Sequence, residues 1–184
     1  MRASWLNLHL WIPQRDVRKI IYGLLNKYDR IMVECAHLSH LKIQKMAGHK
    51  IAKQCAKRGY LSLFKWVVGR SGCKVTDGHF LIAVENGQTS VVEYILIVRK
   101  PHLQSYYCEV AARCGHLSVL KLLNRYDCPW YPIIVCSCAA LNGHAHILDW
   151  LLSIGIEISV SEYGYQRCVE KGHTAVLKWL ENHK

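Results

Sequence analysis

Apolar residues recur along most of the chain in a pattern that predicts pairs of short helices. A glycine separates the two helices of each pair, and apolar residues follow it four, five and eight positions later. That spacing places the three side chains on one face of a helix. The residue six positions after the glycine is charged in every copy, which predicts the solvent-facing side of the same helix. These charged residues are Lys65, Glu93, Lys121, Asp149 and Lys178.

The separating glycines define the period of the pattern. They are Gly59, Gly87, Gly115, Gly143 and Gly172. Successive copies therefore lie 28 or 29 residues apart, a period in the range of solenoid repeats. Each glycine is expected to end the first helix in the left-handed conformation. Four residues before it stands a small residue, alanine or cysteine, which indicates close contact between helices. The sequence predicts five units of helix, tight turn, helix and loop.

The repeated unit carries a family resemblance. Residues 111–123 read Ala-Ala-x-x-Gly-His-Leu-x-Val-Leu-Lys-Leu-Leu, which resembles the helix-turn-helix core of ankyrin repeats. The resemblance implies an all-α, ankyrin-like helical-repeat solenoid over residues 51–184. The period is shorter than the usual ~33 residues, and the Thr-Pro-Leu-His opening is absent. The missing residues are expected to come from the hairpin finger between units.

One connecting loop resembles a particular subset of ankyrin repeats. Its sequence Asp127-Cys128-Pro129-Trp130 is similar to a short-repeat ankyrin set that is abundant in large DNA viruses of amoebae and in some protists. This resemblance implies a viral protein acting in the host cytoplasm, or in the virion if it is structural.

Residues 1–50 do not follow the repeat register and are expected to form an N-terminal helical cap. A proline followed by spaced apolar residues predicts an amphipathic helix, and a cap would shield the apolar face of the first repeat. The same segment also resembles the F-box, the helical module that docks on the Skp-type adaptor of cullin ubiquitin ligases. That resemblance implies adaptor docking by Ile12, Pro13, Val17, Ile20 and Leu24.

Charge is distributed unevenly along the chain. Residues 1–70 hold 14 Lys and Arg against 3 Asp and Glu, whereas residues 71–184 hold ten of each. Such a basic end favours an acidic protein surface, nucleic acid or an anionic membrane as partner, although it also fits a basic surface that only aids solubility. No apolar run reaches the ~20 residues of a membrane span, and residues 1–11 make a poor signal peptide. An intracellular location is expected.

The cysteines and histidines could in principle bind a metal ion, but their spacing does not favour such a site. Among nine cysteines, no Cys-x-x-Cys pair or zinc-finger spacing occurs, so buried free thiols in a reducing compartment are expected rather than disulfides or metal. His116, His144 and His173 each follow a turn glycine directly. A hydrogen bond from each ring to the local backbone of its turn is expected, and not a shared ligand set.

An aromatic series recurs seven residues after the glycines, at Trp66, Tyr94, Trp150 and Trp179. Aromatic residues at helical core spacing bury large apolar areas, so contact between successive second helices is expected. An exposed ladder for a peptide or for bases is the alternative.

The sequence contains no Gly-x-Ser-x-Gly motif, phosphate-binding loop, His-Glu-x-x-His motif or close carboxylate pair in a plausible pocket. No catalytic residue, metal or cofactor is therefore predicted, and a non-enzymatic protein-interaction scaffold is favoured. The ubiquitin-ligase resemblance would make it a substrate receptor; the alternatives are a structural component of a large assembly and a nucleic-acid-binding protein. Turn and loop residues are expected to contact the partner, namely Arg58, Asn86, Arg113, Trp130 and Asn142.

Overall fold

A computed structural model of the chain describes residues 45–158 and 160–183. The chain divides into two compact units, Met1–Lys42 and Ile43–Lys184, and the described residues all belong to the second. The predicted N-terminal cap and the adaptor-docking residues Ile12, Pro13, Val17, Ile20 and Leu24 lie outside the described residues.

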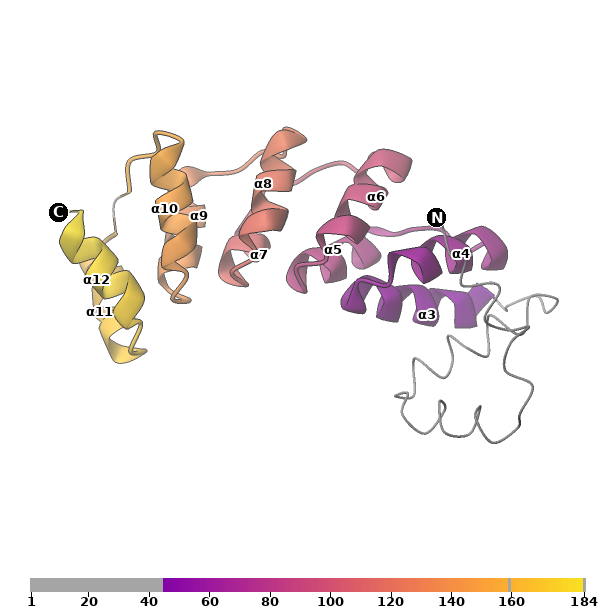
Figure 1. Cartoon of the computed structure of the whole chain (residues 1–184), viewed down its shortest axis with the longest axis horizontal. Coiled ribbons are helices and arrows are strands. Elements are labelled where there is room, and N and C mark those ends of the chain that lie inside the picture. Colours follow the sequence, from indigo (N-terminus) through magenta and orange to yellow (C-terminus); the bar gives the residue numbers. More distant parts are fainter. Residues whose placement is uncertain (1–44, 159, 184) are drawn as a thin grey trace, which may run out of the picture. The chain divides into compact units, whose positions relative to one another are not determined.

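The described residues form helices joined by turns and loops, with no strand among them (Figure 1). They fold as an all-α helical repeat, as the sequence predicts. The first described helix spans Lys45–Arg58, so it includes residues on both sides of the boundary expected at residue 50. The helices are α3 (Lys45–Arg58), α4 (Leu61–Ser71), α5 (Asp77–Glu85), α6 (Thr89–Arg99), α7 (Ser105–Arg113), α8 (Leu117–Arg125), α9 (Pro132–Ala140), α10 (Ala145–Ser153), α11 (Glu162–Glu170) and α12 (Thr174–Asn182).

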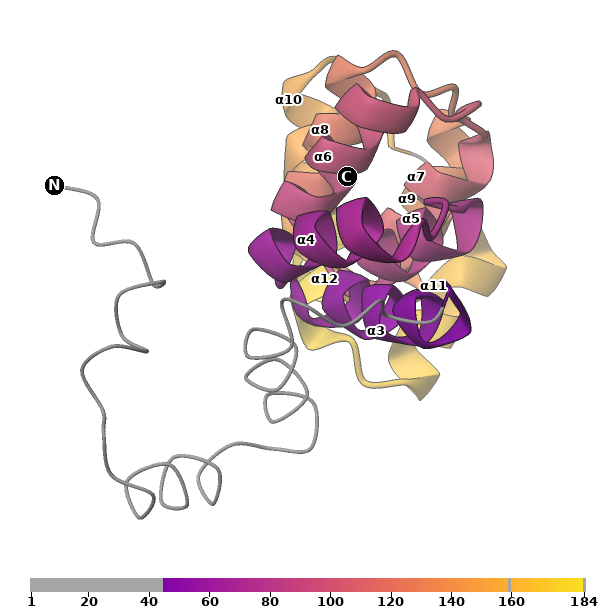
Figure 2. The ribbon, with the colours of Figure 1, turned by 90° about the vertical axis from the view of Figure 1, so that its right-hand side faces the viewer.

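The helices of this unit pack in two layers. The first helices of the pairs, α3, α5, α7, α9 and α11, contact one another in series. The second helices, α4, α6, α8, α10 and α12, form the other layer (Figure 2). The loops between pairs, at 72–76, 100–104, 126–131 and 154–161, contain no strand among their described residues. The short period therefore leaves helix pairs joined by plain loops.

Each pair turns at its predicted glycine. In the third repeat Gly115 has φ +80°, and its N–H donates to the Ala112 carbonyl at 3.2 Å while the His116 N–H donates to the Ala111 carbonyl at 2.9 Å. These two bonds make a Schellman turn, which satisfies carbonyls left unpaired at a helix end. All five turn glycines have φ between +69° and +82°. The prediction of a left-handed glycine is confirmed.

The core follows the repeat register closely. The small residues four positions before the turn glycines are all buried, and the apolar positions of the second helices are buried in the three central repeats. Leu63, Leu177 and Leu180, in the outer repeats, are only partly buried. Val169 in α11 is 46% exposed, whereas Val84, in the same position of α5, is fully buried. No further repeat covers α11 within the part of the chain that is described.

The second helices α4, α6, α8 and α10 end in a left-handed residue, at Gly72, Lys100, Asp127 and Gly155 respectively. After two of these residues the chain turns inward, so that Cys73 and Cys128 are buried. Six of the eight cysteines in the described ranges are buried, as predicted. No helix in this part of the chain is both long and apolar enough to cross a membrane.

Candidate functional site

The histidine after each turn glycine links its repeat to the preceding one. His116 Nε2 lies 3.0 Å from the Glu85 carbonyl oxygen, and His144 Nε2 lies 3.0 Å from the Arg113 carbonyl oxygen. His173 makes the same bond to Leu141. The prediction of a bond to the local backbone was therefore wrong. Carbonyls at the end of the preceding first helix lack partners within their own helix, and the ring N–H of the next repeat donates to one of them.

The same rings cover the turn glycines of the preceding repeat. A Cβ built on Gly115 would lie 2.6 Å from the nearest atom of the His144 ring, and one on Gly87 would lie 2.6 Å from the His116 ring. Glycine is thus required twice, for its backbone conformation and for the space that the ring occupies. Gln88 replaces histidine in the second repeat, and its Nε2 donates to the Lys57 carbonyl at 3.1 Å.

Two members of the aromatic series, Tyr94 and Trp179, contact the preceding second helix. The Tyr94 ring of α6 meets the Phe64 ring of α4 edge to face, with centroids 6.0 Å apart, and the Lys65 ammonium lies 4.9 Å from the Tyr94 centroid. Trp179 of α12 donates a hydrogen bond to the Asp149 carboxylate of α10. The predicted contact between second helices is confirmed at Tyr94 and Trp179.

Two of the predicted partner-binding residues act within their own helices. The Asn86 side chain donates to the Ile82 carbonyl at 2.8 Å, and Asn142 donates to the Cys138 carbonyl at the same distance. The Ile82 carbonyl also accepts the Asn86 backbone N–H at 3.1 Å, so the side-chain amide is a second donor to a carbonyl near the end of its first helix. Their amide oxygens remain as the groups that a partner could contact.

The other predicted contact residues differ in exposure. Arg113 is exposed, and a hydrogen bond with Tyr106 is the main cause that raises the pKa of its guanidinium. Arg58 is half-buried. Trp130 is also half-buried: its indole N–H donates to Asn124 Oδ1 at 3.1 Å, and its ring centroid lies 6.4 Å from that of Trp150. Trp130 therefore packs mainly against its own chain.

A more exposed apolar set lies on the first helices, and sequence reasoning missed it. Three of its members stand nine residues before a turn glycine, on the neighbouring helices α7, α9 and α11. Its most exposed members are Ile133, 76% exposed, and Tyr163, 71% exposed. The signal in the sequence is an apolar residue at a repeat position outside the buried register. We call this set the first-helix stripe: Tyr106, Ile133, Ile134 and Tyr163 on the helices, together with Tyr131 directly before α9.

A basic face lies on α3. Lys50, Lys53 and Lys57 are exposed, and their spacing of three and four residues puts them on one side of the helix. Residues 45–76 contain no Asp or Glu. The basic end predicted from the sequence therefore extends into the first repeat as an exposed lysine face.

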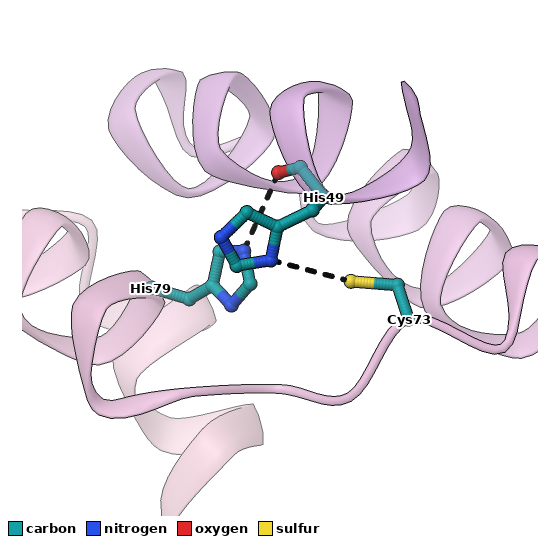
Figure 3. A group of neighbouring side chains, drawn as sticks. All are labelled: His49, Cys73 and His79. Atoms are coloured by element: carbon teal, nitrogen blue, oxygen red, sulfur yellow. Dashed lines mark hydrogen bonds between the residues drawn. The ribbon is translucent and has the colours of Figure 1, made fainter. Parts of the chain in front are cut away.

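A histidine–cysteine cluster lies between the first two repeats (Figure 3). His49 belongs to α3, Cys73 follows α4, and His79 lies in the first turn of α5. One ligand atom from each residue lies within 4.8 Å of the other two. The three residues are the group in the described part of the chain whose atoms could hold a metal ion. Sequence reasoning missed them because their spacings of 24 and 6 residues match no zinc-finger pattern.

No protein-family model matches the chain, and no curated protein matches its sequence.

Proposed function

We propose that the chain is a non-enzymatic protein-interaction scaffold and that the first-helix stripe contacts its partner. One observation carries the proposal: exposed apolar residues occupy the same register position in three consecutive first helices, at Tyr106, Ile134 and Tyr163. Contiguous exposed apolar residues mark protein-contact sites. Tyrosine is enriched in interface hot spots because it buries a large ring and keeps a polar tip.

The repeat stack would present this stripe as a pre-formed surface. Hydrogen bonds such as His144 to Arg113 join consecutive repeats, so the first helices keep their relative positions before a partner arrives. A rigid surface loses little conformational entropy on binding. An ankyrin-like identity of the repeats belongs to the same proposal, supported by the helix-turn-helix units and their glycine turns.

The partner we propose is apolar where it meets the stripe and acidic where it meets α3. Lys50, Lys53 and Lys57 form an exposed basic face with no carboxylate nearby in sequence, which attracts an acidic surface. Nucleic acid is the alternative occupant of that face.

A narrower form of the proposal makes the chain a viral substrate receptor of a host ubiquitin ligase. Its support is the F-box-like sequence around Pro13 and Leu24, together with the resemblance of the repeats to viral ankyrin-like proteins. A structural role in a virion is the competing form. Recovery of adaptor and cullin by the wild-type chain, and their loss with Leu24→Asp, would distinguish the first form from the second.

The scaffold proposal is tested by partner capture with the full-length chain. Wild-type protein and the double variant Ile133→Lys/Tyr163→Lys are compared in pull-downs from cell extract, read by quantitative mass spectrometry. We expect the double variant to lose at least about 90% of the specifically captured protein, because two buried charges in an interface cost several kcal/mol.

The matched control is Ile97→Lys/Val98→Lys, which adds the same two charges at exposed apolar residues of α6 in the other layer. Its capture should equal that of wild type, and all three proteins should show the same helical circular dichroism and melting temperature. Equal capture by the wild type and the double variant would exclude the stripe as the contact surface.

A further inference from the structure

The buried polar residue His79 has no counterpart in the repeat register. It is 1% exposed, whereas the residues at the same position in the third and fourth repeats are Tyr107 and Val135, both apolar core residues. Burying an imidazole carries a desolvation cost unless it gains partners. His79 is the one buried polar side chain in the described core, and its neighbours are His49 and Cys73.

The distances around His79 are close to those of a zinc site. Cys73 Sγ lies 3.8 Å from His49 Nδ1, and the rings of His49 and His79 have centroids 4.4 Å apart. Bonds of about 2.3 Å from zinc to sulfur and about 2.0 Å to nitrogen place tetrahedral S and N ligands about 3.6 Å apart. A small rotation of exposed His49 would bring the three donor atoms around one ion.

The hydrogen bonds of His79 determine which of its nitrogens binds. The Thr76 N–H donates to His79 Nδ1 at 3.1 Å, and His79 Nε2 faces the His49 carbonyl oxygen at 3.5 Å. Coordination through Nε2 requires the ring proton to move to Nδ1. There the Thr76 hydroxyl oxygen, 3.1 Å away, accepts it, while the bond from the Thr76 N–H is given up. Such a partner on the second ring nitrogen is usual for histidine ligands.

The charge state of the cluster suits a cation that binds thiolate and imidazole. Zinc binds neutral imidazole and thiolate, and the cluster offers two imidazoles and one thiol within 4.8 Å. The positive charges of Lys53 and Arg99 act on His79 and oppose any bound cation. The thiolate of Cys73 offsets part of that charge, and Arg99 is itself paired with Asp77.

We propose that His49, Cys73 and His79 bind one Zn²⁺ ion through Nδ1, Sγ and Nε2, with water in the fourth position. Binding releases the Cys73 thiol proton to solvent, and no electron is transferred. A donor set of one sulfur and two nitrogens favours zinc over Mg²⁺ and Ca²⁺, which prefer oxygen ligands. The ion joins α3, the loop after α4 and the start of α5, so it clamps the first repeat to the second.

The proposal is tested by metal titration of the full-length, metal-free protein. Added Co²⁺ is expected to bind at one ion per chain, with a thiolate-to-cobalt charge-transfer band and the visible bands of a tetrahedral ion. Zn²⁺ should displace it and raise the melting temperature, since a ligand that binds only the folded state stabilises it. Cys73→Ser should abolish the charge-transfer band, and His49→Ala should weaken binding at least about tenfold.

The matched controls are Cys114→Ser and His102→Ala, a cysteine and an exposed histidine outside the cluster, and both should bind as wild type. His49 is exposed, so its alanine variant remains informative even if Cys73→Ser fails to fold. The proposal is overturned if the wild type binds no stoichiometric metal. Unchanged binding by His49→Ala would overturn it equally, because the ion would then lie on other side chains.

Discussion

A turn glycine in this protein can be required for two reasons, its left-handed backbone and the space that a neighbouring ring occupies. The copies of the repeat differ in whether the second reason applies. Gly115 has φ +80° and lies under the His144 ring. Gly172 has φ +70°, but no atom lies within 4 Å of a Cβ built on it. The two glycines therefore share the backbone requirement and differ in the steric one.

Alanine substitutions at these two glycines should differ in cost. Gly172→Ala is expected to destabilise by about 1–2 kcal/mol, the cost of a left-handed alanine. Gly115→Ala should cost at least about 1 kcal/mol more, because its methyl group displaces the His144 ring. Urea unfolding of the full-length chain measures both. Equal costs would mean that the ring moves aside freely.

The hydrogen bonds of His116, His144 and His173 act between elements, since each joins the end of one first helix to the next helix pair. Burial is the main cause that lowers the pKa of His144, although its bond to the Arg113 carbonyl acts in the opposite direction. The unfolded chain therefore binds more protons at this site than the folded chain once the pH falls below about 7. Under these conditions stability falls with pH.

Replacing His144 with glutamine should reduce that pH dependence. Gln88 already makes the equivalent link in the second repeat, so His144→Gln is expected to keep most of the stability at about pH 7.5. Between about pH 7.5 and about pH 5.5 the variant should lose less stability than wild type, because it cannot take up a proton. Urea midpoints at the two pH values give the result, with exposed His102→Gln as the control. An identical loss in His144→Gln and wild type would contradict this explanation.

Patterns within one repeat could be predicted from the sequence, whereas contacts between repeats could not. Helices, turn glycines and the buried face around Leu120 follow from local spacing. The acceptor of His144, by contrast, lies 31 residues away, and its identity depends on how neighbouring repeats pack. The cluster of His49, Cys73 and His79 draws on three elements, so no short motif reveals it.

The same limit applies to the proposed contact surface. The turn residues Asn86 and Asn142 suggested binding because they are polar and follow a helix. Their side chains instead donate to carbonyls of their own helices, a contact that depends on the folded geometry of each helix end. The sequence pattern assigned no role to Ile133 or Tyr163, because their exposure depends on the side of the helix that neighbouring repeats leave uncovered.

On the scale of the whole molecule, the lysine face and the first-helix stripe lie in different repeats. Lys50, Lys53 and Lys57 are on α3 in the first repeat, and the helical residues of the stripe are on α7, α9 and α11. A partner that used both surfaces would have to extend along several repeats. Its association rate should then depend on salt, and its dissociation rate on the apolar contacts.

Charge reversal on α3 tests whether its exposed lysines attract an acidic partner. The variant Lys50→Glu/Lys53→Glu/Lys57→Glu should bind an acidic peptide such as polyglutamate at least about tenfold more weakly than wild type at low salt. Lys121→Glu, an exposed change on α8, should have little effect. Fluorescence anisotropy at 50 and 200 mM salt measures both, and a duplex DNA is titrated in parallel. Tight DNA binding with a steep salt dependence, lost in the triple variant, would favour the nucleic-acid alternative.

The covering of Gly115 by His144 has a consequence for how such a chain can change in evolution. The two residues belong to different copies, so a gene duplication or deletion preserves the pairing only if it adds or removes a whole number of units. The duplicated or deleted segment can begin at any position within a unit, provided that its length is a whole number of units. Each glycine then still contacts a ring from the copy that follows. Half-units would leave a glycine uncovered and a ring without its acceptor. The length of the protein can therefore change in steps of about 28 residues while each joint stays chemically the same.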